Sequence, residues 1–285
     1  MNLDAAAASE QIPPHNETLD TSTQPAAARW DDLLTLQTDL FFQHEVDVFR
    51  ANADWLRAAS VLDVGCGNGY YISRLAACFP ERRYTGLDTS PALIANAKAR
   101  PEARTISFIA GDYFAYEPNE LYDAILMRFV VQHLTDMAAI LRKTTTLLSV
   151  EGSLFIIEPD LTHSTNLPAT PLFMDMLSAY DAAAAAKGRI RAQLSRLPSL
   201  VQRQSGWEVA SDRRLSVPNA GPFLGRPLAS LFSKWIDLCE YAAQLPFAYE
   251  AVRKEIEDWA RHSDSLSRIC LRLVQLKYTA GDAKS

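Results

Sequence analysis

The stretch that decides the fold is Val61-Leu-Asp-Val-Gly-Cys-Gly-Asn-Gly-Tyr-Tyr71. Its first residues form a short apolar run, which is typical of a strand buried on both faces of a parallel sheet. Glycines at alternate positions follow, and apolar residues at helical spacing then run from Ile72 to Phe79, where Pro80 ends the pattern. A strand, a glycine-rich turn and a helix predict the first half of a nucleotide-binding crossover, because glycines let a ligand approach the backbone and a helix N-terminus offers free N–H groups.

The spacing of these glycines discriminates between ligands. A dinucleotide pyrophosphate site requires Gly-x-Gly-x-x-Gly, whereas Gly65, Gly67 and Gly69 form Gly-x-Gly-x-Gly, with Asp63 two residues ahead of the first. This pattern favours a ligand without a pyrophosphate. The segment resembles motif I of the class I S-adenosylmethionine (SAM) dependent methyltransferases, and the resemblance implies that Asp63, Gly65, Cys66 and Gly67 contribute to cofactor binding.

A second acidic residue follows at an informative distance. Residues 83–88 predict a second strand that ends at Asp88, and Ser90-Pro91 begins a helix. Asp88 comes about 20 residues after the glycines, which is the spacing of the ribose-binding acid in dinucleotide folds. A carboxylate at this position accepts hydrogen bonds from both ribose hydroxyls, and SAM carries the same ribose. Asp88, with the adjacent Thr89, is therefore a predicted part of the cofactor site.

A third and a fourth strand complete the predicted cofactor site. Residues 106–110 lead into Asp112 and Tyr113. The resemblance implies that Asp112 accepts from the exocyclic amine of adenine, while Tyr113 lies against the ring or presents its N–H. The fourth strand, residues 122–127, leads into Arg128, which in the family passes the methionine part of SAM. Ligands of parallel sheets sit outside the carboxyl ends of the strands, so the acceptor site is expected to begin here.

The candidate catalytic residues are His133 and Arg128. Among five histidines, His133 is the best general base because it follows the fourth strand, and an ordinary histidine pKa near 6.5 suits it to take a proton at neutral pH. The alternative is a histidine packed beside the cofactor or capping a helix. Arg128 would hold a carboxylate in a two-pronged contact, or pair with Glu158 or Asp160. Gln132, His133 and Glu158 are the predicted substrate-binding residues.

The resemblance implies an α/β fold, Rossmann-like, with a seven-stranded, mostly parallel sheet, helices on both faces and an antiparallel last strand. Asp136 is expected to cap a helix that runs through Leu148. Apolar residues at helical spacing around Trp235 and Trp259 add α-helical insertions, which would pack on the domain as a cap or form a homodimer interface.

The predicted division of the chain is a disordered leader at 1–28, a helical segment at 29–58, a SAM-binding core at 59–160, a helical segment or partial cap at 161–205, a core strand at 206–217, a helical cap at 218–267, and the last strand and tail at 268–285.

The composition excludes several classes of partner. The chain has 285 residues, of which 48% are hydrophobic, and a formal net charge of −6 with a pI near 5.4. No overall basic field attracts nucleic acid, and no apolar run reaches the roughly 18 residues of a membrane span. The four cysteines are far apart, so they are expected to be free thiols in a reducing compartment, the cytoplasm. No Cys, His and Asp cluster has the spacing of a metal site.

These features together predict a SAM-dependent methyltransferase that acts on an O, N or C atom of a small-molecule acceptor, in specialised metabolism. Two alternatives stay open. A protein or RNA methyltransferase would need a basic groove or a targeting element, which the acidic balance and the apolar insertion disfavour. A catalytically inactive SAM-fold scaffold subunit typically lacks some of the motif I residues, whereas Asp63, the three glycines and Asp88 are all present here.

Overall fold

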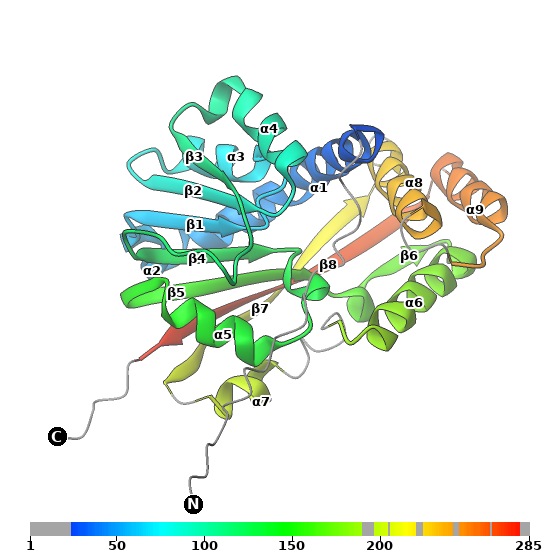
Figure 1. Cartoon of the computed structure of the whole chain (residues 1–285). Helices are drawn as coiled ribbons and strands as arrows, with labels where there is room; N and C mark the ends of the chain where they lie inside the picture. The colour runs from blue at the N-terminus through cyan, green and yellow to red at the C-terminus, as the bar shows by residue number, and fades with distance from the viewer. Residues whose placement is uncertain are drawn as a thin grey trace, which may run out of the picture.

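The computed structural model describes residues 24–189, 197–204, 206–220, 225–241, 245–262 and 264–279. Its centre is an eight-stranded mixed sheet (Figure 1). The strands are β1 (Ser60–Val64), β2 (Arg83–Asp88), β3 (Ile106–Ala110), β4 (Tyr122–Arg128), β5 (Leu148–Pro159), β6 (Thr165–Leu167), β7 (Trp207–Ala220) and β8 (Leu266–Tyr278). The predicted Rossmann-like fold is confirmed, and the structure adds the three-residue strand β6.

The strand order is β3-β2-β1-β4-β5-β8-β6, with β7 also paired to β8. Strands β1 to β5 are parallel to one another, and β8 runs antiparallel to β5, β6 and β7. One edge of β8 pairs with β7 along its whole length, so β5 and β6 share the other edge, where β6 meets the three residues of β8 from Leu266 to Arg268. The order reverses beside β1, which creates the switch point where open α/β sheets bind ligands.

Helices cover both faces of the sheet, as Figure 1 shows. One face carries α1 (Gln24–Arg50), α2 (Ala53–Arg57), α3 (Tyr70–Cys78) and α4 (Pro91–Ala99), and the other carries α5 (Met137–Thr145) and α7 (Leu197–Gln202). The first group shares a core with buried Phe49, Trp55 and Phe155, whose rings contact one another. Two helical layers around an apolar sheet explain why its central strands contain almost no exposed residue.

Three further helices gather beyond the carboxyl ends of the parallel strands (Figure 1). They are α6 (Pro171–Ala186), α8 (Gly225–Tyr241) and α9 (Tyr249–Arg261), and α8 also packs against α1. The apolar residues predicted at helical spacing are buried within the chain: Phe232 of α8 contacts Phe173 of α6 and Trp259 of α9. The predicted insertion at 218–267 begins within β7 and ends within β8, because these two strands form a longer pair than the sequence pattern indicates.

Several element ends follow from local capping. Ser90 accepts a hydrogen bond from the Leu93 N–H at the start of α4, and Asp136 accepts one from the Ala139 N–H at the start of α5. The predicted end of that helix at Leu148 is wrong. The helix ends at Thr145, because Leu148 pairs with Tyr122 as the first residue of β5. Helix α1 begins at Gln24, inside the segment predicted as a leader, and residues 1–23 and 190–196 lie outside the described part.

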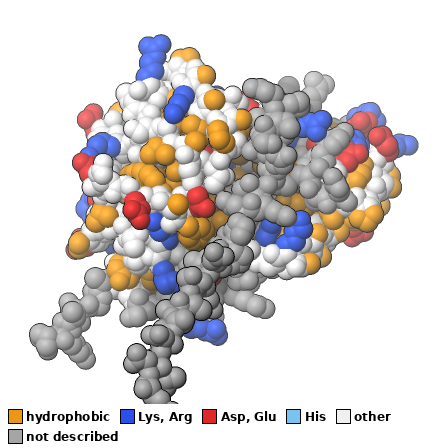
Figure 2. All heavy atoms as spheres, in the orientation of Figure 1, with side chains coloured by type: hydrophobic (Ala, Val, Ile, Leu, Met, Phe, Trp, Pro, Cys, Tyr) orange, Lys and Arg blue, Asp and Glu red, His pale blue; other side chains and the backbone are white. Residues whose placement is uncertain are grey.

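In the described part of the chain, none of the helices combines the length and the apolar character needed to cross a membrane. All four cysteines of the chain are described, and each is a free thiol, as expected. Figure 2 shows one face of the molecule, on which hydrophobic side chains form patches between charged side chains of both signs.

Gly69 generates the first prediction, because it closes the glycine turn at the N-cap of α3 with a φ of 70°. A Cβ atom there would lie 2.7 Å from the Ala97 Cβ and 2.8 Å from the Phe108 ring. We expect Gly69→Ala to lower the free energy of unfolding by roughly 2–5 kcal/mol, the sum of left-handed strain and overpacking. Denaturant unfolding measures this change.

The matched control is Gly188→Ala. Gly188 has a φ of 73°, but no atom of the described residues lies within 4 Å of a Cβ atom placed there. This variant should lose only the strain, about 1–2 kcal/mol. Equal losses in the two variants would show that the close approach of α4 and β3 to the turn does not require a glycine.

Candidate active site

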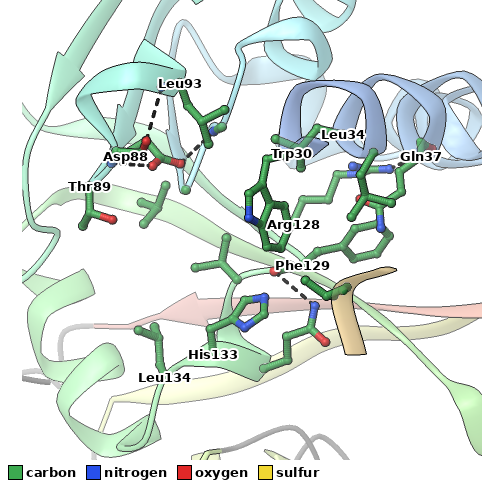
Figure 3. A pocket seen from close by; sticks show the side chains of 18 of the residues that line it. Trp30, Leu34, Gln37, Asp88, Thr89, Leu93, Arg128, Phe129, His133 and Leu134 are labelled. Atoms are coloured by element: carbon green, nitrogen blue, oxygen red, sulfur yellow. Dashed lines mark hydrogen bonds between the residues drawn. The ribbon is translucent and has the colours of Figure 1, made fainter. Parts of the chain in front are cut away.

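The candidate site is a cavity of about 240 Å³ at the carboxyl ends of the parallel strands. The ends of β1, β2 and β4 supply one wall, and α1, α6 and α8 supply side chains opposite them. Figure 3 shows Asp88 and Thr89 at one end of the cavity, and His133 and Leu134 at another, with Trp30 reaching from α1 toward Phe129. The cavity therefore joins the predicted cofactor residues to the predicted acceptor residues.

The glycine turn is anchored to the end of β2. The N–H groups of Gly65 and Cys66 both donate to the carbonyl oxygen of Leu87, at 2.7 and 3.1 Å. The N–H of Gly67 donates to Oδ2 of Asp88 at 2.8 Å. Because these donors are used within the protein, the turn is held in place without a ligand. Gly65 and Gly67 line the cavity with their backbone.

Asp88 has the geometry that a ribose diol requires. Its Oδ2 accepts from Gly67, and its Oδ1 accepts from the N–H of Ser90 at 2.9 Å. Burial raises the pKa of Asp88, and the two backbone N–H groups oppose that rise. A carboxylate oxygen accepts more than one hydrogen bond, so both oxygens retain capacity for a hydroxyl donor. Thr89 follows directly and also lines the cavity.

Asp112 and Tyr113 lie at the same end of the cavity, after β3. Oδ1 of Asp112 accepts from the N–H of Phe114 at 2.8 Å, which leaves Oδ2 for an amine donor. The hydroxyl of Tyr113 lies 2.7 Å from the Thr144 hydroxyl, and burial raises the pKa of the Tyr113 phenol. The Tyr113 hydroxyl therefore connects the segment after β3 to α5 through a hydrogen bond.

Arg128 forms a buried ion pair with Glu45 of α1. Its Nε lies 3.0 Å from both carboxylate oxygens of Glu45, and its Nη2 donates to the Gln37 carbonyl at 3.3 Å. The guanidinium also lies 4.3 Å from the ring centroids of Tyr71 and Phe129. Arg128 lines the cavity, but its charge is balanced from α1.

The predicted pairing of Arg128 with Glu158 or Asp160 is wrong. Asp160 binds Nδ1 of His163 and Nε of Arg214, each at 2.9 Å, on the outer part of the sheet. Glu158 is fully buried, and its Oε1 accepts from the N–H of Gln132 at 3.2 Å. Glu158 therefore supports the segment after β4 from behind the wall of the cavity.

Asp63 and Cys66 also lie behind the wall rather than in the lining that the described residues form. Both are buried, beneath the glycine turn. Burial raises the pKa of Asp63 to about 8; nearby Arg128 opposes this rise, while Asp88 and Glu45 add to it. Burial likewise raises the pKa of the Cys66 thiol, which disfavours a reactive thiolate.

The acceptor end combines polar residues after β4 with aromatic residues from distant helices. Gln132 and His133 line the cavity from a short 3₁₀ turn, Val131–His133, and the Gln132 side chain donates to the Phe129 carbonyl at 3.2 Å. Lining residues that the sequence patterns did not single out as site residues include Trp30, Leu33, Leu34 and Gln37 of α1, Leu177 and Tyr180 of α6, Arg189, and Trp235, Leu238 and Cys239 of α8. The one sequence signal for some of these residues is their apolar spacing at helical period. That spacing indicates a buried helix face and does not distinguish a cavity lining from core packing.

Known proteins resemble this chain over part of its length. A family model described as a methyltransferase domain matches residues 62–154. The malonyl-(acyl-carrier protein) O-methyltransferase of Bacillus anthracis is 32% identical over 94 residues, 33% of this chain and 35% of that protein. The trans-aconitate 2-methyltransferase of Klebsiella pneumoniae is 31% identical over 134 residues, 47% of this chain and 52% of that protein. Residues 62–154 therefore form a methyltransferase domain.

The solved structure of the plantazolicin methyltransferase BpumL, in complex with a triazolic desmethylPZN analog and SAH, has a TM-score of 0.51. It is 15% identical, and the match covers 90% of this chain and 92% of that one. This likeness concerns the fold alone. The match to these curated relatives spans about a third to a half of their length.

The structure divides the predicted site residues into two groups. Gly65, Gly67, Asp88, Thr89, Asp112, Tyr113, Arg128, Gln132 and His133 line one cavity, whereas Asp63, Cys66 and Glu158 lie behind it. Their individual roles stay predictions. Within the described residues, no three His, Cys, Asp or Glu side chains are grouped so as to hold a metal ion.

Asp63 generates a prediction on pH dependence. Its pKa is about 8 in the folded protein and about 3.9 in an unfolded chain. Between these values the folded state binds more protons than the unfolded state, so Asp63 makes the free energy of unfolding fall as pH rises. We expect wild type to lose stability relative to Asp63→Asn from about pH 4 to pH 8, by at most roughly 1.4 kcal/mol per pH unit.

Denaturant unfolding of the two proteins at pH 5, 6.5 and 8 measures this difference. Groups that titrate alike in both proteins cancel when the two are compared. Parallel pH profiles would contradict a proton on Asp63 in the folded state.

Proposed function

We propose that the protein transfers the methyl group of SAM to a small-molecule acceptor bound in the same cavity. The observation that carries this proposal is the continuity of the cavity from Asp88 and the glycine turn to His133 and Trp235. When bound, SAM supplies a methyl group that its own sulfonium charge activates. The protein then has to align the acceptor and exclude water, and alignment contributes up to roughly 7–11 kcal/mol.

The cofactor end of the cavity has donors and acceptors for each part of SAM. In this proposal Asp88 accepts from the ribose hydroxyls, with Thr89 beside it, and Asp112 accepts from the adenine amine. Tyr113 contributes its backbone, because its hydroxyl is bonded to α5. Gly65 and Gly67 let the ligand approach the turn, which Asp63 and Cys66 support from below.

The helices at the carboxyl ends of the strands form the proposed cap. Side chains of α6 and α8 line the cavity, and α9 supports them from behind through buried Val252, Ile256 and Trp259. In this proposal α6, from the predicted segment 161–205, and α8 and α9, from the predicted segment 218–267, form one helical layer over the acceptor. Excluding water strengthens polar contacts and protects the reactive sulfonium. A cap of this kind favours a small acceptor over a protein or RNA chain.

The relatives are named for a malonyl group on an acyl-carrier protein and for trans-aconitate. These names support a small acceptor group, and a place in specialised metabolism stays a prediction. The free thiols fit the proposed location in the cytoplasm. The direct test is incubation of the purified protein with SAM and acceptor candidates, followed by mass spectrometry. A gain of one methyl group with formation of S-adenosylhomocysteine is expected.

Asp88→Ala tests the cofactor end. The variant loses both acceptors for the ribose, and each hydrogen bond to a charged group is worth about 1.5–3 kcal/mol. We expect the affinity for SAM and for S-adenosylhomocysteine to fall at least roughly tenfold in calorimetry. Asp47→Ala, which removes an exposed acid from α1, is the control. Undiminished affinity in the Asp88 variant, with normal thermal unfolding, would remove Asp88 from the site.

His133→Ala tests the acceptor end. For an acceptor that must lose a proton, loss of the base should lower kcat by about 10²–10⁴ and leave SAM affinity nearly unchanged. The fall in rate at acidic pH, where a histidine is protonated, should disappear from the remaining activity. His262→Ala, on the exposed end of α9, is the control. A variant that keeps the acidic limb and most of its rate would assign His133 to packing.

A further inference from the structure

We propose that Trp235 of α8 is a specificity-determining residue, because it limits how far an acceptor extends away from the cofactor. Its ring separates the cavity from a second, smaller pocket that suits an apolar extension of the acceptor. The inference rests on the proposed function and deepens it: the acceptor of the wild-type protein is a compact molecule that ends at Trp235.

The smaller pocket lies among α6, α8, β6 and β8, whose residues line it. Its volume is about 20 Å³, which leaves space for about one water-sized group, because such a group needs roughly 10–15 Å³. Three of the described side chains line both this pocket and the cavity: Leu161, Leu177 and Trp235. These side chains therefore form the wall between the two spaces.

Other aromatic rings hold Trp235 from the side of the smaller pocket. The centroid of its ring lies 6.3 Å from the parallel ring of Phe173 and 5.8 Å from the ring of Phe232. In the described part of the chain, Phe173 and Phe232 line the smaller pocket and not the cavity. The indole therefore has the cavity on one side, and these two rings with the smaller pocket on the other.

The chemistry of the smaller pocket favours an apolar group. Phe173, Met174 and Ile269 contribute to its walls, and a group buried against them gains from the apolar area removed from water. Two polar residues of the lining bond to each other, since the Ser267 hydroxyl donates to the side-chain oxygen of Asn166 at 2.7 Å. An apolar group beside this pair leaves its hydrogen bond in place.

Loss of the indole would join the two spaces. When a large buried side chain is shortened, the neighbouring residues fill the space only in part. An apolar space of this kind stays dry and binds small hydrocarbon groups. Trp235→Ala should therefore extend the cavity into the smaller pocket and admit longer acceptors.

A graded series of 4-alkylphenols, from methyl to heptyl, tests the wall. The ring suits the aromatic lining of the cavity, and the chain measures the available length. In calorimetry with S-adenosylhomocysteine present, the affinity of wild type should rise with chain length and fall once the chain meets Trp235. In Trp235→Ala, chains beyond that limit should bind roughly fourfold tighter for each added methylene that becomes buried. The shortest member should gain nothing.

Trp235→Phe keeps a ring and provides a second variant in case the alanine variant does not fold. It should shift the limit in the same direction but to a shorter chain than Trp235→Ala. Thermal unfolding and the affinity for S-adenosylhomocysteine report whether each variant is folded, since the cofactor residues are unchanged. A variant that is merely destabilised would bind every member of the series more weakly, without a shift of the limit.

Two controls separate the wall from other changes in volume. Leu238→Ala removes bulk from the same helix, but among the two spaces Leu238 lines only the cavity, so the limit should stay that of wild type. Met174→Ala enlarges only the smaller pocket. It should have no effect while Trp235 is present, and it should favour still longer chains when it is combined with Trp235→Ala.

The same measurements distinguish failure of the inference from failure of the proposed function. If S-adenosylhomocysteine binds but the chain-length limit is the same in wild type and both Trp235 variants, the inference is overturned and the proposed function stands. An equal shift in Leu238→Ala likewise overturns the assignment to Trp235. Absence of binding of SAM and S-adenosylhomocysteine to the wild-type protein overturns the proposed function itself.

Discussion

The buried ion pair between Glu45 and Arg128 connects the two halves of the site. The side chain of Glu45 is fully buried and that of Arg128 is 6% exposed. Arg128 ends β4, whereas Glu45 lies toward the C-terminal end of α1, so the pair fixes the helix across the carboxyl ends of the strands. Removing one partner of a buried pair typically costs about 3–5 kcal/mol, because the other charge is left uncompensated. The placement of Trp30 and Gln37 over the cavity depends on this anchor.

The same pair sets the electrostatics beneath the glycine turn. Arg128 is close enough to lower the pKa of Asp63, but burial, Asp88 and Glu45 outweigh it, and the pKa of Asp63 stays near 8. When Asp63 is protonated, the glycine turn therefore has no second buried negative charge beside that of Asp88. Helix α1 thus influences the cofactor end in two ways, through the side chains that it places over the cavity and through the charge of Glu45 below it.

The parts of the fold that could be predicted are those whose signal is local. Strands β2 and β3 match their predicted ranges, because short apolar runs, glycines and Ser-Pro or Asp caps mark their ends. The partner of Arg128 could not be predicted, since 83 residues separate it from Glu45 and both charges are compatible with an exposed surface. Likewise, α5 ends at Thr145 because Leu148 pairs with Tyr122 of β4 as part of strand β5. Apolar residues at helical spacing carry no information on this strand pairing.

The cap helices show where periodicity stops being informative. Trp235 and Trp259 both fall on apolar faces at helical spacing, yet their surroundings differ. Trp259 lies against Phe232 and donates its indole N–H to the Leu167 carbonyl at 3.2 Å, which joins α9 to β6. Trp235 lines the cavity. Spacing identifies the face that is buried, but only the packing of α8 between α1 and α9 determines which tryptophan is enclosed between helices and which lines the cavity.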